Sequence, residues 1–215
     1  MQIDQLIQTI ALAGIPVLFA ITLHEAAHGY VARHFGDMTA HQEGRISLNP
    51  LRHIDPIGTI LVPLMTMLMG GVLFGWAKPV PVNFAALRRP KQDMLWVAIA
   101  GPAANLVMAM GWALVYKLAW SFPGNYFAEP LMGMAQLGIK INIILMVLNL
   151  LPLPPLDGGR VVVSLLPHRQ AFQLAKLEPY GMFILIFLAV TPVLSWLLSP
   201  LIGLTYKMLS FLFGI

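Results

Sequence analysis

The sequence predicts an all-α membrane protein, a polytopic helical bundle of about five to six membrane segments. Hydrophobic residues make up 58% of the 215 residues and charged residues only 10%, whereas about a quarter of the residues of a soluble protein are charged. The mean hydropathy is +0.77. Uncharged runs long enough to cross a bilayer recur along the chain, and prolines or glycines interrupt some of them. We therefore also expect a re-entrant segment and a short membrane-associated β edge.

Composition also excludes several classes of protein. With no cysteine in the chain, disulfides, thiolate zinc sites and thiol nucleophiles are excluded, so His, Asp and Glu must supply any metal site. The net charge is +4, but the basic residues lie between apolar runs, as they do in the cytoplasmic loops of membrane proteins. We expect the lipid bilayer as a partner and no nucleic acid.

The first apolar segment predicts a membrane-spanning helix over residues 5–32. Between Asp4 and Glu25 lie 20 residues without a formal charge, which is the length of a span. No Lys or Arg precedes Arg33, and a secretory signal would begin with positive charge. The first segment is therefore predicted to be a retained span.

The next stretch predicts a polar loop over 33–55, whose three histidines are expected to be solvated. A run of 22 uncharged residues follows, from Pro56 to Ala77, and Gly70-Gly71 interrupts it. We expect this run to be re-entrant, with the glycine pair at its reversal point. Segment 72–83 is β-branched, aromatic and proline-spaced, which is typical of an extended edge.

The rest of the chain predicts further membrane helices. Residues 94–116 are an uncharged run of 23, and a helix over 131–151 carries Lys140 inside it. A snorkelling and a cavity-facing Lys140 are both open. Two prolines then divide an uncharged run of 28 residues into one span near 180–198 and a short segment, 201–213, that returns or lies in the interface.

Two histidines and a glutamate stand at the end of the first span. Residues four apart on a helix share a face, so His24 and His28 direct their imidazoles to one spot, with Glu25 beside them. This HExxH spacing supplies two imidazole ligands for zinc and a carboxylate that can take a proton from the attacking water. The alternative is a charged helix end at the membrane interface.

The second informative stretch, 149–160, has the sequence NLLPLPPLDGGR. Its prolines and glycines break the helix while its other residues stay apolar, so irregular backbone is held at membrane depth, where it must be buried in protein or line a cavity. Asp157 is the only carboxylate between Glu129 and Glu178. Two interpretations are equally open: a functional carboxylate with a partner, or an N-cap for a helix over 159–166.

Taken together, two imidazoles and a remote carboxylate leave a fourth zinc position for water, which favours a catalytic over a structural site. Zinc would lower the pKa of a water molecule and polarise a carbonyl. Glu25 would take the proton and deliver it to the leaving amine. Amide hydrolysis with one zinc ion per chain is the expected chemistry.

These motifs resemble those of the site-2 proteases, a family of intramembrane zinc metalloproteases. HExxH stands at 24–28, a GPxxN-like segment at 101–105 and an NxxPxPxLDGG-like segment at 149–159, in the order of the family. The resemblance implies that His24, His28 and Asp157 are the zinc ligands and that Glu25 is the base. It also implies that Asn149 and Asn105 support the site, although packing between helices explains Asn105 equally well.

The resemblance further implies a substrate that is a transmembrane segment of another protein, cleaved in regulated intramembrane proteolysis. No PDZ-like or CBS-like domain is visible, so the chain resembles a minimal bacterial or archaeal member. We expect one domain over 1–215, with a catalytic core at about 5–166 and C-terminal membrane segments at 179–213. The competing class is a membrane protein that binds or transports a metal without proteolysis. Glu25 favours hydrolysis, because transport needs no general base.

Segment 72–83 is predicted to bind the substrate. An intact helix hides its amides in internal hydrogen bonds, so an unwound substrate that adds a strand to this edge would be the better target. The candidate substrate-binding residues are Gly71, Val72, Phe74 and Trp76.

The direction of the helices predicts the topology. Asp157 and the histidines can meet only if helices 5–32 and 131–151 run parallel, which requires 57–76 to be re-entrant instead of a complete span. That arrangement also places loop 121–130, which has no Lys or Arg, opposite the basic loops. We therefore expect an integral protein of a bacterial or archaeal cell membrane, with an external N-terminus and an active site toward the cytoplasm.

Overall fold

The structure, a computed structural model, describes residues 3–62, 65, 75 and 77–215. Most of this part of the chain is helical, and none of it is a β-strand. The elements, in order, are α1 (Ile3–His34), α2 (Thr39–Gln42), η1 (Pro50–His53), η2 (Pro56–Leu61), η3 (Phe84–Ala86), α4 (Pro90–Trp120), α5 (Ala128–Asn149), α6 (Asp157–Leu165), α7 (His168–Ala175), α8 (Glu178–Val190) and α9 (Pro192–Phe213).

Four of the described helices are long and apolar enough to cross a membrane: α1 over Ala11–His34, α4, α5 and α9. Helices α7 and α8 meet at a bend of 59° and would together make a fifth, broken span. The prediction of a polytopic, all-α membrane protein is therefore confirmed, and the three long N-terminal helices begin and end within a few residues of the predicted bounds.

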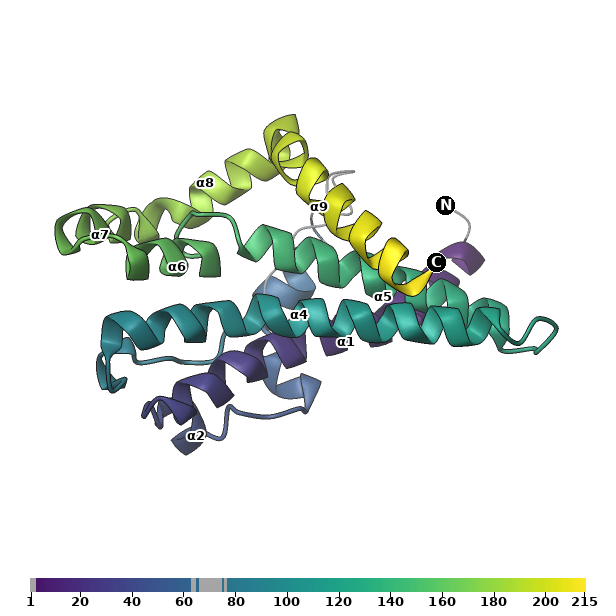
Figure 1. The fold of residues 1–215 in the computed structure, drawn as a ribbon, viewed down its shortest axis with the longest axis horizontal. Helices are drawn as coiled ribbons and strands as arrows, with labels where there is room; N and C mark the ends of the chain where they lie inside the picture. Colours follow the sequence, from purple (N-terminus) through teal and green to yellow (C-terminus); the bar gives the residue numbers. More distant parts are fainter. Residues whose placement is uncertain (1–2, 63–64, 66–74, 76) are drawn as a thin grey trace.

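Helices α1, α4 and α5 pack against one another and form the centre of the bundle (Figure 1). In Figure 1, α1 and α5 run in the same direction and α4 runs in the opposite direction. The C-terminal ends of α1 and α5 therefore lie at the same end of the bundle, where α6 follows. This is the parallel arrangement that the sequence required.

The run from Pro56 to Ala77 begins and ends at one place. The Lys78 N–H donates to the His53 carbonyl oxygen at 2.9 Å, and Arg45 Nη2 donates to the carbonyl oxygens of Lys78 and Pro79 at 3.1 Å. A complete span would separate its ends by about 30 Å. The two ends of the run therefore meet, as a re-entrant segment requires, while the predicted reversal point Gly70-Gly71 lies outside the described residues.

The predicted β edge differs from what is observed. Residues 77–83 form no strand, because Pro79 and Pro81 have no N–H to pair and two of the remaining amides bind side chains. The Val80 N–H donates to Glu25 Oε2 at 2.7 Å, and the Asn83 N–H donates to Asp37 Oδ2 at 2.7 Å. The segment is held against the end of α1 by carboxylates.

The C-terminal helices divide at a different place from the predicted one. Helix α8 ends at Val190, and α9 runs through Pro200 without a break. Proline at the first position of a helix lacks only an N–H that would be unpaired anyway, so Pro192 starts α9. A proline inside a membrane helix is tolerated where neighbours satisfy the freed carbonyl. One 22-residue helix replaces the predicted short segment 201–213.

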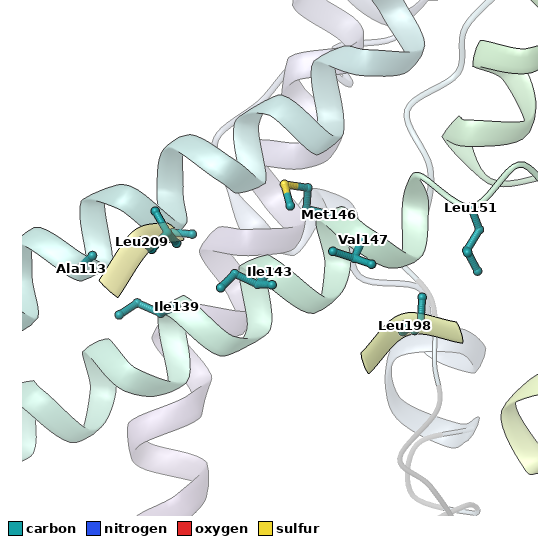
Figure 2. Close-up of a cluster of buried hydrophobic side chains, with 9 residues drawn as sticks. Ala113, Ile139, Ile143, Met146, Val147, Leu151, Leu198 and Leu209 are labelled. Atoms are coloured by element: carbon teal, nitrogen blue, oxygen red, sulfur yellow. The ribbon is translucent and has the colours of Figure 1, made fainter. Parts of the chain in front are cut away.

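A core of apolar side chains joins α4, α5 and α9 (Figure 2). Small residues on α4 let α5 approach, and a Cβ on Gly138 of α5 would overlap the Trp112 ring. This packing fixes α5, and therefore the chain that follows it, relative to α4. The core residues are Ala109, Ala113, Ile139, Ile143, Met146, Val147, Leu151, Leu198 and Leu209.

Of the three histidines in loop 33–55, His34 and His41 are exposed, as expected. The prediction is wrong for His53, which is buried. Its Nε2 lies 2.9 Å from the Ser47 carbonyl oxygen, and its own carbonyl accepts from Lys78. Burial follows because His53 lies at the joint where the re-entrant segment returns, a contact between distant residues that local composition does not encode.

Candidate metal centre

His24 and His28 stand one turn apart on the buried face of α1, against α4. Their Nε2 atoms are 3.2 Å apart, and the two rings meet edge to face with centroids 4.8 Å apart. The HExxH spacing therefore directs both imidazoles to one point, as the helical period requires.

Asp157 reaches the same point from α6. Its Oδ2 lies 3.3 Å from His24 Nε2 and 3.4 Å from His28 Nε2. Within the described residues, the three side chains form a group that could hold a metal ion, with ligand atoms within 4.8 Å of one another. Of the two open interpretations, the N-cap is wrong, because Asp157 is the first residue of α6 and no side chain caps that helix.

Two glycines let α6 start where it does. A Cβ on Gly158 would overlap the carbonyl oxygens of Leu150 and Leu151, and a Cβ on Gly159 would overlap the backbone of Leu153 and Pro154. Any other residue at these positions would push α6 away from the preceding chain. The glycine pair thus sets the distance between Asp157 and the histidines.

The direction of the His28 ring follows from its backbone partner. His28 Nδ1 lies 2.7 Å from the Val97 carbonyl oxygen. A carbonyl oxygen can only accept, so Nδ1 carries the proton and donates. The Nε2 atom of His28 is then left with a lone pair that points to the metal group.

A chain of amides fixes the His24 ring in the same way. Asn142 Nδ2 donates to the Gly138 carbonyl oxygen at 2.8 Å, so its Oδ1 is the atom that accepts from Asn105 Nδ2 at 2.9 Å. Asn105 Oδ1 is therefore the atom 2.6 Å from His24 Nδ1. The proton lies on Nδ1, and the lone pair of His24 Nε2 points to the metal group.

Asn142 is the residue that sequence reasoning missed. It and Asn105 are both completely buried, and Asn105 also donates to the Ala20 carbonyl oxygen at 3.3 Å. The sequence does contain a signal for Asn142, because it is an amide inside an apolar run, as Asn105 is.

Asn105 has both of the roles that the sequence left open. It packs between helices, and it also supports the His24 ring.

The donor atoms fit a cation. Both imidazole protons lie on Nδ1, so two nitrogen lone pairs and one carboxylate oxygen face one another. Three such groups repel unless a positive ion lies among them, and Asp157 Oδ2 is buried without a hydrogen-bond donor in the described residues. Two imidazoles and one carboxylate are the ligands of many catalytic zinc sites.

Gly101 provides the room for an ion. A Cβ at this position would lie 2.6 Å from His24 Nε2 and would overlap His28 Nε2. The glycine of the 101–105 segment therefore lets α4 pass close to both rings while leaving the space between them open.

Glu25 lies beside the group and is half-buried. Its Oε2 accepts the hydrogen bond from the Val80 N–H, so the segment that follows the re-entrant run contacts the predicted base. Packing at Gly29 brings the two together, because a Cβ there would press on Val80 at 3.1 Å and on Ile46 at 2.9 Å.

Asn149 is the last residue of α5, and its Nδ2 donates to the Leu145 carbonyl oxygen at 3.0 Å. Among the described residues, no hydrogen bond joins it to the histidines or to Asp157, so its support of the site stays a prediction. The predicted substrate-binding residues lie outside the described part of the chain: Gly71, Val72, Phe74 and Trp76.

The sequence profile of Peptidase family M50 matches residues 121–192, which include the broken stretch and Asp157. A Bacillus subtilis protein with the provisional name zinc metalloprotease YwhC is 39% identical over 192 residues, 88% of this chain and 84% of that protein. The Rip2 protein of Mycolicibacterium smegmatis, also provisionally named a zinc metalloprotease, is 34% identical over 83% of this chain and 66% of its own. No solved structure matches the chain.

The fold and the site define a membrane-embedded metalloenzyme. The chain belongs to peptidase family M50, the site-2 protease family of zinc metalloproteases. It is a peptide hydrolase and an integral membrane protein, zinc is its cofactor, and His24, His28 and Asp157 form the group that could hold the ion.

Proposed function

We propose that this protease cleaves peptide bonds in or near the transmembrane segments of other membrane proteins. The position of the metal group carries the proposal. His24 and His28 belong to the apolar helix Ala11–His34, and Asn105, which holds the His24 ring, belongs to the candidate span Pro90–Trp120. A site built on spans meets substrates that share the same bilayer.

In this mechanism, His24, His28 and Asp157 hold zinc, whose contribution when bound is to lower the pKa of a water molecule and polarise the scissile carbonyl. Glu25 takes the proton of the attacking water as the C–O bond forms. It then delivers that proton to the amide nitrogen as the C–N bond breaks. The Val80 N–H holds Oε2, so we assign proton transfer to Oε1.

Two asparagines have different roles in the proposal. Asn105 already uses its amide to bind His24, Asn142 and Ala20, so we assign it to positioning the His24 ring. Asn149 has one hydrogen bond to its own helix and is half-buried. Release of that bond would free an amide donor for the developing oxyanion.

The substrate is proposed to bind in unwound form along the segment that contains Gly71, Val72, Phe74 and Trp76. This segment leads directly into Val80, whose amide binds Glu25. A peptide that pairs with the segment would therefore extend toward the base. Main-chain pairing recognises an extended backbone with little dependence on side chains.

We also propose in which membrane the protein lies and on which side its active site opens. The relatives come from bacteria, which supports a bacterial cell membrane. The basic loops that flank the metal group favour the cytoplasmic side. A site on that side would release the cytoplasmic parts of membrane-tethered substrates, as regulated intramembrane proteolysis requires.

Glu25→Gln tests the proposal. The substitution removes the base and keeps both imidazoles, so purified protein in liposomes should keep its zinc and lose about 10²–10⁴-fold of its cleavage rate on a model transmembrane substrate. Glu43→Gln, in the exposed loop, is the matched control and should cleave normally. Mass spectrometry of cells that carry Glu25→Gln should find uncut membrane proteins.

Two results would overturn the proposal. The first is a near wild-type cleavage rate for Glu25→Gln. The second is zinc movement across the liposome membrane by the wild-type protein without any cleavage, which would identify a metal transporter.

A further inference from the structure

Lys140 is a charged residue in the middle of a membrane helix, and the proposed mechanism does not use it. It is the only charged residue between Glu129 and Asp157. Helix α5 is a candidate span of 22 residues, and Lys140 is about 18 Å from its start and about 14 Å from its end at 1.5 Å per residue. Lysines snorkel to the membrane surface from near helix ends, and this one is not near an end.

The Lys140 side chain faces away from the rest of the bundle. It is exposed and forms no hydrogen bond or ion pair with any described residue. Ile139 and Ile143 pack into the core that α9 completes, and Asn142 points to Asn105 and the metal group. Gln136, one turn before Lys140 on the same face, is also exposed.

An ammonium group on this face requires an acceptor. Lipid tails have none, and lipid headgroups lie at the membrane surfaces. Ionisable residues in membrane helices pair with a group of opposite charge or with backbone carbonyls. The helices that pack on α5, which are α1, α4 and α9, leave Lys140 without such a group in the described residues.

We propose that a separate transmembrane helix with an Asp or Glu inside its apolar span docks on the Gln136–Lys140 face of α5. Charge complementarity selects this occupant, because the carboxylate would pair with Lys140 while Gln136 would supply a second polar contact. A second copy of the chain fits poorly, since a symmetric contact on this face would bring two lysines together. Docking needs no hydrolysis, so it is independent of the proposed intramembrane cleavage.

The test uses the full chain in liposomes. The chain lacks cysteine, so Phe122→Cys in the exposed α4–α5 loop provides one site for a fluorescent donor. Three Leu/Ala membrane peptides that carry an acceptor dye differ only at their central residue, which is Asp, Asn or Leu. Energy transfer measures the association of each peptide with the protein.

The Asp peptide is expected to bind about tenfold more tightly than the Leu peptide, the effect of one strong polar contact between membrane helices. In the Lys140→Met variant, the Asp peptide should bind no more tightly than the Leu peptide. Lys117→Met, at the end of α4, is the matched control and should have no effect. Lys140→Glu should bind a peptide with a central Lys, which restores the pair with reversed charges.

Equal binding of the three peptides would overturn the proposal, as would unchanged binding in Lys140→Met. Energy transfer between two labelled copies of the chain that Lys140→Met abolishes would assign the face to self-association and would also overturn it. The zinc content of Lys140→Met should equal that of the wild-type protein. Loss of peptide binding in this variant could then not be explained by misfolding or by failure of the metal site.

Discussion

The metal group depends, at the scale of single residues, on where two imidazole protons lie. Val97 fixes the proton of His28 directly, whereas His24 depends on Asn105 and, through it, on Asn142. If the Asn105 amide turned over, its NH2 group would face His24 Nδ1, and the ring would lose its acceptor. Asn142 is therefore a positioning residue for a ligand that it does not touch.

Replacing Asn142 with Leu should weaken zinc binding about 10–100-fold, the usual effect of losing a residue that orients a metal ligand. Asn142→Asp should retain most of the affinity, because its carboxyl keeps an acceptor for Asn105 and, when protonated, a donor for Gly138. Competition with a chelator measures both variants independently of cleavage. Equal affinity of the Leu variant and the wild-type protein would show that Asn105 keeps its orientation unaided.

Gly101→Ala should fill the space between the two rings. The added methyl group would lie 2.6 Å from His24 Nε2 and closer to His28 Nε2, so we expect the zinc content to fall from one ion per chain toward zero. Gly111→Ala, on the same helix in open space, is the control and should keep its zinc. Elemental analysis of the two purified variants measures zinc per chain. Full zinc occupancy in Gly101→Ala would show that the ion does not lie between the two rings.

At the scale of elements, the broken stretch between α5 and α6 has the largest influence on the site. It turns the chain so that the first residue of α6 faces the histidines of α1. Its glycines are required by backbone contacts and not by a left-handed conformation, because Gly158 lies against two carbonyl oxygens. Backbone atoms cannot rotate away as side chains can, so the tolerance for added volume here is low.

Gly158→Ala should therefore displace α6. We expect a loss of at least about 1–3 kcal/mol of stability together with loss of zinc, because Asp157 moves with the helix. Gly133→Ala in α5 meets only Leu12, at an ordinary 3.6 Å, and should be nearly neutral. Thermal unfolding with zinc analysis checks both, and a stable Gly158→Ala variant with full zinc would refute the argument.

At the scale of the whole molecule, the place where the run from Pro56 to Ala77 begins and ends fixes the direction of the helices that follow it. The hydrogen bond between His53 and Lys78 holds the two ends of this run together. Helices α1 and α5 then run parallel (Figure 1), and the histidines and Asp157 meet at one end of the bundle. A complete span at this place would invert α5 and separate the ligands.

Single cysteines test this topology, since the chain has none of its own. With an external N-terminus, Tyr126→Cys in the exposed α4–α5 loop should react with an impermeant thiol reagent on intact cells. Glu43→Cys and Ala85→Cys should react only after the membrane is permeabilised. Labelling of Ala85→Cys from outside while Glu43→Cys stays protected would mean that the segment crosses the membrane. Labelling of both from outside, with Tyr126→Cys protected, would mean that the whole arrangement is inverted.

The sequence by itself determined the class of protein, the HExxH pair and the parallel direction of α1 and α5. The class and the HExxH pair follow from hydropathy and the helical period, which are local properties that a chain carries in any context. The parallel direction followed from the placement of the basic loops and from the requirement that two distant motifs share one metal, which only one arrangement of the helices allows.

Only the tertiary structure decided that Asp157 faces the histidines instead of capping α6, that His53 is buried and that Asn142 belongs to the metal centre. It also decided that α9 continues through Pro200 and that residues 77–83 bind Glu25 and Asp37 instead of forming a strand. Each outcome depends on a meeting between residues far apart in the chain, such as His24 and Asn105, which are separated by 81 positions. The physical reason is that the burial of a side chain and its hydrogen bonds depend on which distant residue packs against it. The local sequence around one residue does not identify that partner.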